Sequence, residues 1–183
     1  MIRYAALLRG VNVGGNAKIA MADLRSVLTG LGHQDVKTLR QSGNAVFLGS
    51  ATWAAPALAG RIEEALATRL DLKTRVLLLT HEQLSAVIEA NPFPSAESEP
   101  SKHLVQFLYE PLTAASRARI AEFDAGTFAP EEFRVGADVI YFRFPDGMGR
   151  SKIAVAFGRQ VTAKMVMTGR NWNTVRKLHD LTA

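Results

Sequence analysis

The sequence predicts an α+β fold built from two successive βαββαβ halves. The chain has 183 residues, of which 48% are hydrophobic and 21% charged, a composition typical of a globular protein with a core of its own. Short apolar runs typical of strands and amphipathic stretches typical of helices follow one another in the same order twice. A polar, proline-containing stretch at residues 91–100 separates the two series.

In the first half, hydrophobic periodicity defines each element. Leucines and valines recur at three- and four-residue spacing before Gly32, which is a typical helix stop. Pro56 suits the first turn of the second helix, and the sequence Gln-Ser-Gly-Asn at 41–44 suits a hairpin connection. The expected elements are strand 4–11, helix 21–31, strands 36–40 and 45–48, helix 56–70 and strand 73–79. This order is the ferredoxin-like pattern.

The second half repeats this order of elements without convincing residue-level similarity. A helix at 81–90 links the halves and ends at Asn91-Pro-Phe-Pro94, where two prolines prevent its continuation. The expected elements are strand 104–109, helix 114–123, strands 132–135 and 139–144, helix 151–157, strand 161–167 and an extra C-terminal helix at 171–181. We therefore expect two ferredoxin-like repeats, residues 1–90 and 91–183, packed as one compact unit.

Composition also bears on location. The chain contains no cysteine, which excludes disulfides, thiolate metal sites and cysteine nucleophiles and suits a reducing cytosol. Arg9 interrupts the N-terminal apolar stretch before it is long enough for an export signal. No apolar window is long enough to span a bilayer. We expect a cytoplasmic protein that does not associate with a membrane.

The basic residues are unevenly distributed. The formal net charge is +5, and every residue between Gly147 and His179 that carries a formal charge at neutral pH is basic. A segment of one sign can create a field that attracts anions. The alternative interpretation is an ordinary solvated surface.

The first candidate ligand site is the loop at residues 10–16. It joins a strand to a helix, where backbone N–H groups and the helix dipole favour anions, and Arg9 and Lys18 flank it. Its spacing, G-x-x-x-G-G, matches neither a dinucleotide fingerprint nor a P-loop. Alternatively, its glycines only allow left-handed turn conformations.

The second candidate is the glycine-rich turn at residues 146–152, which leads into a helix. Arg150 and Lys152 would lie at the start of that helix, where cations oppose the helix dipole unless an anion binds. The alternative is a simple turn with Ser151 as the helix N-cap.

The third candidate is Arg170-Asn-Trp-Asn-Thr174, at the start of the last helix. Asn171 suits an N-cap and Trp172 a core anchor, which leaves Arg170 and Asn173 to form planar or bidentate hydrogen bonds to a ligand. We include Ser42 and Asn44, although turn chemistry explains them well. The candidate ligand-binding residues are Arg9, Asn12, Gly14, Gly15, Lys18, Ser42, Asn44, Arg150, Lys152, Arg170, Asn171 and Asn173.

The sequence identifies no catalytic residue, cofactor or metal site. The histidines, His33, His81, His103 and His179, share no motif and have no ligand partner at i+4. Ser42 lacks the G-x-S-x-G elbow of a nucleophile. An enzyme that uses Arg, Asn or Ser is left open.

Four segments together resemble a known family: residues 8–16 with Lys18, residues 41–44, residues 91–94, and residues 168–175 with Lys177-Leu178. In this order and spacing, over residues 4–181, the chain resembles the bacterial domain of unknown function 1697 family. The resemblance implies a duplicated ferredoxin-like fold. It implies no activity, substrate or catalytic residue.

The leading hypothesis is binding of a small anionic or nucleotide-like ligand at the basic Gly/Asn-rich turns. There are three alternatives: nucleic-acid binding by a ferredoxin-like sheet, an enzyme of unknown reaction that uses Arg, Asn or Ser, and a protein-interaction module. The basic C-terminal third favours nucleic acid weakly. Against it, the stretch nearest to an RNP1 pattern, residues 139–144, lacks the glycines.

Overall fold

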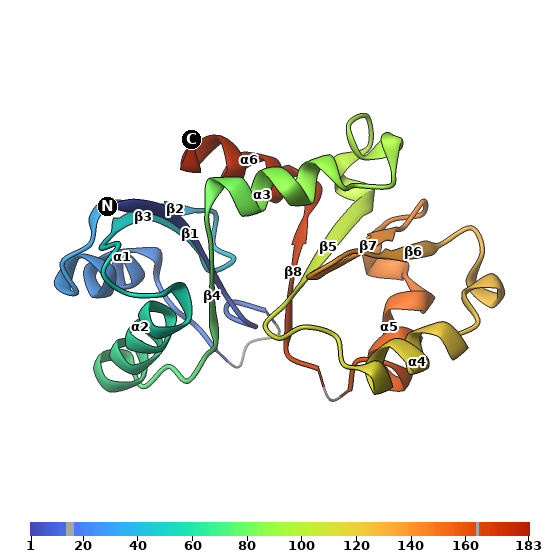
Figure 1. Ribbon diagram of the computed structural model, residues 1–183, viewed down its shortest axis with the longest axis horizontal. Coiled ribbons are helices and arrows are strands. Elements are labelled where there is room, and N and C mark those ends of the chain that lie inside the picture. The colour runs from blue at the N-terminus through green and yellow to red at the C-terminus, as the bar shows by residue number, and fades with distance from the viewer. Residues whose placement is uncertain (14–16, 164) are drawn as a thin grey trace. The chain divides into compact units, whose positions relative to one another are not determined.

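A computed structural model describes residues 1–13, 17–163 and 165–183. The described residues form two four-stranded antiparallel sheets, with strand orders β2-β3-β1-β4 and β6-β7-β5-β8 (Figure 1). In each, the first strand of the half lies between the third and the fourth, which is the ferredoxin-like arrangement. The predicted α+β class with a duplicated ferredoxin-like pattern is confirmed.

Helices and strands follow the predicted order. The first half contains β1 (Ile2–Leu8), α1 (Met21–Gly30), β2 (Gln34–Leu39), β3 (Asn44–Gly49), α2 (Ala55–Leu70), β4 (Val76–Leu79) and α3 (His81–Glu89). The second contains β5 (His103–Leu108), α4 (Ala114–Glu122), β6 (Glu132–Val135), β7 (Val139–Arg143), α5 (Lys152–Gln160), β8 (Met167–Asn171) and α6 (Trp172–Thr182). Short 3-10 turns lie at Pro94–Ala96, Pro100–Lys102, Ala125–Phe128 and Met148–Arg150. Within the described ranges, no helix has the length and apolar character needed to cross a membrane.

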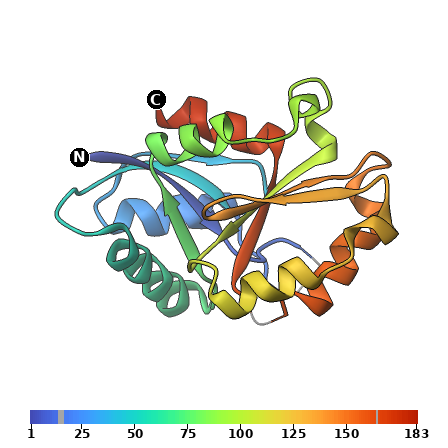
Figure 2. The same cartoon turned by 45° about the vertical axis from the view of Figure 1, so that its right-hand side comes forward.

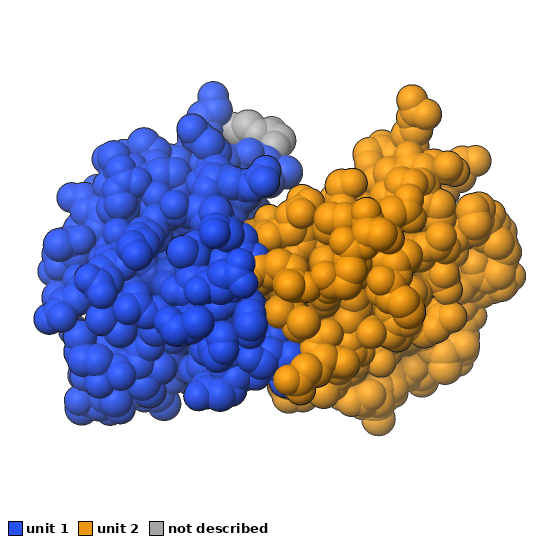
Figure 3. Space-filling model, turned by 90° about the horizontal axis from the view of Figure 1, so that it is seen from above, with its two compact units in different colours: residues 1–86, 177–183 blue, residues 87–176 orange. Residues whose placement is uncertain are grey.

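The chain divides into two compact units, coloured separately in Figure 3. The first comprises Met1–Ala86 together with Lys177–Ala183, and the second comprises Val87–Arg176. The boundary expected from the sequence, after residue 90 and with the whole C-terminal helix in the second half, stays a prediction. In the structure α3 and α6 each contribute residues to both units.

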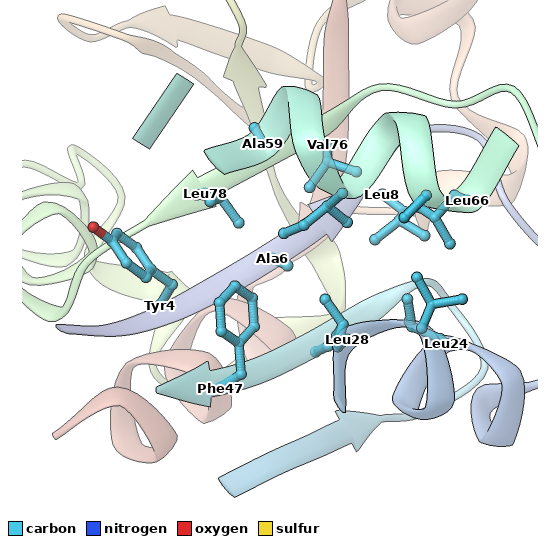
Figure 4. Close-up of a cluster of buried hydrophobic side chains, with 14 of the residues drawn as sticks. Tyr4, Ala6, Leu8, Leu24, Leu28, Phe47, Ala59, Leu66, Val76 and Leu78 are labelled. Atoms are coloured by element: carbon cyan, nitrogen blue, oxygen red, sulfur yellow. The ribbon is translucent and has the colours of Figure 1, made fainter. Parts of the chain in front are cut away.

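The core of the first unit lies between one face of its sheet and helices α1 and α2 (Figures 1, 2 and 4). Ala6 of β1 and Phe47 of β3 are fully buried on this face. Leu24 and Leu28 of α1 pack in the same cluster, because residues four apart share one face of a helix. Ala5 and Leu7, on the opposite face of β1, are also buried, so this strand is a continuous apolar run.

The core of the second unit is aromatic. Phe157 of α5 meets Phe142 of β7 edge-on, with ring centroids 5.3 Å apart and an interplanar angle of 84°. Phe123, which follows α4, meets Phe157 in the same way, at 5.2 Å and 81°. Edge-to-face contacts suit the charge distribution of aromatic rings. These contacts dock α5 on its sheet.

Equivalent backbone hydrogen bonds close the two halves. In each half, the last residue of the first strand donates its N–H to the hairpin turn, and the next residue donates to the residue directly before the fourth strand. The pairs are Leu8–Gly43 (2.8 Å) and Leu108–Asp138 (3.0 Å), then Arg9–Arg75 (2.9 Å) and Tyr109–Val166 (3.1 Å). Because α3 follows β4 and α6 follows β8, each half is a βαββαβα unit.

The predicted strand at residues 161–167 was wrong, because β8 spans Met167–Asn171. Val161 instead follows α5, and its N–H donates to the carbonyl of Phe157 at 2.9 Å. The buried side chains of β8 are Thr168 and Arg170. A strand whose buried face is polar lacks the hydrophobic alternation by which strands are read from sequence.

Gly43 has both a left-handed backbone and no room for a side chain. Its φ is +67°, and an added Cβ would lie 2.1 Å from Cγ2 of Val11 and 3.0 Å from Cβ of Leu8. We predict that Gly43→Ala lowers the free energy of unfolding by about 2–4 kcal/mol, through backbone strain and overpacking. Urea denaturation measures the change.

The matched control is Gly60→Ala in α2, where an added Cβ meets nothing within 4 Å. Alanine there should stabilise the protein by about 0.5–1 kcal/mol, because glycine disfavours helix. Wild-type stability of Gly43→Ala would show that the turn does not pack as described.

Candidate functional site

The β1–α1 connection, the β2–β3 turn and the residues before β4 meet at one end of the first sheet. Asn12, with φ of 55°, is the link. Its Nδ2 donates to the carbonyls of Gln41 (2.6 Å) and Ile19 (2.9 Å), and its Oδ1 accepts from the N–H of Ile19 (3.0 Å). Its own N–H donates to the carbonyl of Ala17 at 2.7 Å. The Asn12 side chain therefore holds the loop and the turn together.

Basic side chains surround this junction. We call Arg9, Lys18, Arg40, Lys73 and Arg75 the basic end of the first sheet; all five residues are exposed. Each of them lies within, or next to, the segments that the hydrogen bonds of Asn12 and Thr74 join, which we call the hydrogen-bonded frame. Lys18 precedes Ile19, Arg40 precedes Gln41, and Thr74, between Lys73 and Arg75, donates its Oγ1 proton to the Arg9 carbonyl at 2.8 Å.

The ion pairs of these residues differ. Arg75 pairs with Glu63 at 3.2 Å. Lys18, Arg40 and Lys73 form no ion pair with any residue that the structure describes. Helix α1 starts after Ala20, and no side chain among the described residues caps it, although Asp23 lies in its first turn. The basic end thus presents cations beside a helix start.

Of the other candidates in the first unit, Ser42 and Asn44 shape the hairpin turn. Asn44 is fully buried, and its Nδ2 donates to Oγ of Ser42 (2.8 Å) and to the carbonyl of Leu39 (3.4 Å). These contacts agree with the turn chemistry read from the sequence. Gly14 and Gly15 lie outside the described residues.

In the second unit, the start of α5 is capped by the chain itself. The Glu131 carboxylate accepts from the N–H of Ile153 (2.8 Å), the N–H of Lys152 (3.4 Å) and Oγ–H of Ser151 (3.1 Å). Ser151 Oγ accepts from the N–H of Ala154 at 3.0 Å, so its predicted N-cap role is confirmed. The position where we expected an external anion near Arg150 and Lys152 holds an internal carboxylate. Sequence reasoning missed Glu131, because nothing local links it to the α5 start.

Arg170 lies on the buried face of β8. Its Nη1 donates to Oγ1 of Thr168 (2.8 Å) and to the carbonyl of Gly169 (2.7 Å). Burial lowers the pKa of the Arg170 guanidinium to about 10, so it remains charged at neutral pH. Both of these acceptors lie on the same strand as Arg170.

At the start of α6, Asn171 is the N-cap and Trp172 is a core residue, as expected from the sequence. Oδ1 of Asn171 accepts from the N–H and the hydroxyl of Thr174, both at 2.9 Å. Trp172 is buried, and its Nε1 donates to Oε1 of Glu97 at 3.1 Å. Asn173 is exposed. Both roles are confirmed. Unlike Arg170 and Asn171, the third candidate of this segment, Asn173, extends into solvent.

Two histidines are core residues. His33 stacks on Phe47 with centroids 4.4 Å apart, and burial, followed by the nearby Arg61, lowers the pKa of His33. His103 shares a hydrogen bond of 3.1 Å with Oγ of Ser95, and burial, followed by Arg143, lowers the pKa of His103. The described part of the chain contains no cluster of three or more His, Asp or Glu side chains suited to a metal ion.

The fold and the site define a duplicated ferredoxin-like α+β protein whose first half carries a basic loop. The chain belongs to the family described as Protein of unknown function (DUF1697), whose model matches residues 1–141. The family membership expected from the sequence is confirmed.

Among solved structures, the chain is similar to "the structure of conserved bacterial protein SP0830 from Streptococcus pneumoniae". The identity is 25%, the match covers 99% of this chain and 98% of that chain, and the TM-score is 0.73. Among curated proteins, no match was found. The similarity supports the fold over both halves.

The cap on α5 leads to a testable prediction. Glu131→Ala removes the carboxylate that accepts from Ile153, Lys152 and Ser151. It should lower the free energy of unfolding by about 1–2 kcal/mol, because helix N–H groups lose a charged acceptor. Thermal and urea unfolding measure the effect.

Glu122→Ala is the control, since Glu122 is an exposed carboxylate at the end of α4. An acid at a helix C-terminus opposes the dipole, so its removal should leave stability unchanged or slightly raised. Equal losses in both variants would refute a specific capping role for Glu131.

Proposed function

We propose that this protein binds a small anionic, phosphate-bearing ligand, such as a nucleotide, at the basic end of the first sheet. The supporting observation is the difference between the two halves at equivalent positions. In the second half, residues 109–113 suffice to connect β5 to α4, and Oγ1 of Thr113 caps the helix by accepting from the N–H of Ser116 at 3.1 Å. In the first half the connection runs from 9 to 20.

The scaffold therefore closes with a short, capped turn in one half and carries a longer, basic loop in the other. A short turn is enough to connect a strand to a helix in this scaffold, so the added length of the first loop supports a role beyond connection. The sequence interpretation in which its glycines only form a turn explains neither its length nor its flanking cations.

The chemistry of the basic end suits phosphate. Lys and Arg form charge-assisted hydrogen bonds to phosphate oxygens, and N–H groups at a helix start favour anions. Lys18 and Arg40 come from different segments that Asn12 ties together. A frame that is ordered before binding lowers the entropy cost of association.

A ligand site at the basic turns of the second unit has less support. Glu131 already occupies the α5 start, so an anion at Arg150 and Lys152 would compete with a carboxylate of the chain. Arg170 and Asn171 already hold their neighbours by hydrogen bonds. Asn173, being exposed, stays a candidate contact. We propose that binding takes place in the cytoplasm, in keeping with the lack of cysteine.

Nucleic acid is the second candidate ligand. The basic segment between Gly147 and His179 favours it. However, Tyr141 and Phe142, the aromatic residues of β7, are each 3% exposed. They therefore cannot stack bases as the surface aromatic residues of an RNA-binding sheet do.

Titration calorimetry at low salt, with mononucleotides and pyrophosphate as probes, tests the proposal. We predict that Lys18→Ala and Arg40→Ala each weaken binding by about tenfold or more, because each removes a charge-assisted contact. Lys37→Ala is the matched control: Lys37 is an exposed cation on β2, outside the basic end.

Absence of binding by every probe would contradict the proposal, as would equal losses in all three variants. Binding only to long polynucleotides, with a steep dependence on salt, would favour the second candidate, because many phosphate contacts release many counterions.

A further inference from the structure

Three of the four strands in the first sheet have an arginine directly beyond their end at the basic end. Arg40 follows β2, Arg9 follows β1, and Arg75 precedes β4. The strand registers bring these ends to one edge of the sheet. The strand order β2-β3-β1-β4 then sets the sequence Arg40, Arg9, Arg75 along that edge. We call these three residues, all of them exposed, the arginine row.

The second half has no cation at the equivalent positions. Gly136 follows β6, Tyr109 follows β5, and Val166 precedes β8. The N–H of Tyr109 donates to the carbonyl of Val166 at 3.1 Å, as the N–H of Arg9 donates to the carbonyl of Arg75 at 2.9 Å. The same backbone closure therefore forms without arginine, and the row is a feature of the first half alone.

Arg9 and Arg75 place two cations at facing positions of adjacent strands. Like charges opposite each other across two strands are destabilising. Glu63 offsets part of this repulsion, because its Oε1 accepts from Nε of Arg75 at 3.2 Å. The same oxygen accepts from the N–H of Val76 at 2.7 Å, which holds the carboxylate at the start of β4. An anion laid along the row would relieve the repulsion further.

The row is wider than a single phosphate group. Neighbouring strands lie about 4.8 Å apart, so the three spacings from β2 to β4 separate the backbone at Arg40 from that at Arg75 by about 14 Å. The bond to Glu63 keeps the Arg75 side chain near the β4 end of the row. One phosphate can meet arginines of adjacent strands, whereas contact with the whole row requires several phosphates joined in a line.

We propose that the arginine row binds a chain of at least three linked phosphates, as in a nucleoside triphosphate or inorganic tripolyphosphate. The inference rests on the proposed function and names the class of ligand for the same site. Each phosphate group offers charged acceptor oxygens to a guanidinium. Because Glu63 already neutralises part of Arg75, a shorter ligand binds near Arg40 and Arg9, and the third phosphate reaches Arg75.

Titration calorimetry at low salt, without divalent cations, tests the length of the ligand. We expect tripolyphosphate to bind the wild type about tenfold or more tightly than pyrophosphate. In Arg75→Gln this advantage should fall below about threefold, because the third phosphate loses its charged donor. Lys37→Gln removes an exposed cation of β2 outside the row and should keep the wild-type advantage.

ATP is titrated beside tripolyphosphate to separate the two sources of linked phosphates. Tighter binding of ATP assigns the chain of phosphates to a nucleotide, and equal or weaker binding assigns it to inorganic polyphosphate. Both results support the linked-phosphate site. Backbone amide shifts of the wild type give a second measurement that needs no variant: tripolyphosphate, unlike pyrophosphate, should shift residues 74–76.

Equal affinities for pyrophosphate and tripolyphosphate would overturn the inference and leave the proposed function standing. So would a tripolyphosphate advantage that Arg75→Gln and Lys37→Gln both retain. Binding of no phosphate probe at all would overturn the proposed function and this inference together. Tighter binding of a single-stranded oligonucleotide, with a steep dependence on salt, would replace the linked-phosphate ligand with nucleic acid.

Discussion

The close packing of Gly43 on Leu8 and Val11 sets the geometry of the whole basic end. With φ of +67° and no side chain, Gly43 lets the β2–β3 turn approach the residues that end β1. The N–H of Leu8 then reaches the Gly43 carbonyl, and Asn12 reaches Gln41. The positions of Lys18 and Arg40 depend on these contacts, because each is next to a residue of this frame.

Comparison of the two halves distinguishes features that both share, and that the fold requires, from features that only one half has. Both halves close with the same backbone hydrogen bonds, from Leu8 in one and Leu108 in the other. The helix starts differ. Thr113 caps α4, and Ser151 together with Glu131 caps α5, so each of these helix starts has side-chain acceptors from the chain itself. The β1–α1 connection is longer and basic, and this is the asymmetry on which a ligand role rests.

Much of the fold could be predicted from sequence because the core follows simple periods. Strand β1 reads as an apolar run, and α1 places Leu24 and Leu28 four residues apart. Strand β8 could not be found in this way, since its buried residues are Thr168 and Arg170. The residue-level repeat was hidden as well, because it lies in backbone hydrogen bonds, which many side-chain types allow.

Only part of the candidate site could be read from the local sequence. Asn171 and Ser151 are caps, as their local sequence indicated, and Arg9 and Lys18 lie at the loop where they were expected. Arg40, Lys73 and Arg75 were missed because only the fold brings their segments to that loop. Glu131 was missed because it caps a helix that begins far from it in the sequence.

Binding of an anionic ligand at the basic end of the first sheet can be followed at single residues. Backbone amide chemical shifts would be recorded while pyrophosphate is added to the isotope-labelled protein at low salt. We expect saturable shifts concentrated at residues 8–20 and 40–44. Shifts confined to residues 150–154, or no saturable shift at any amide, would contradict it.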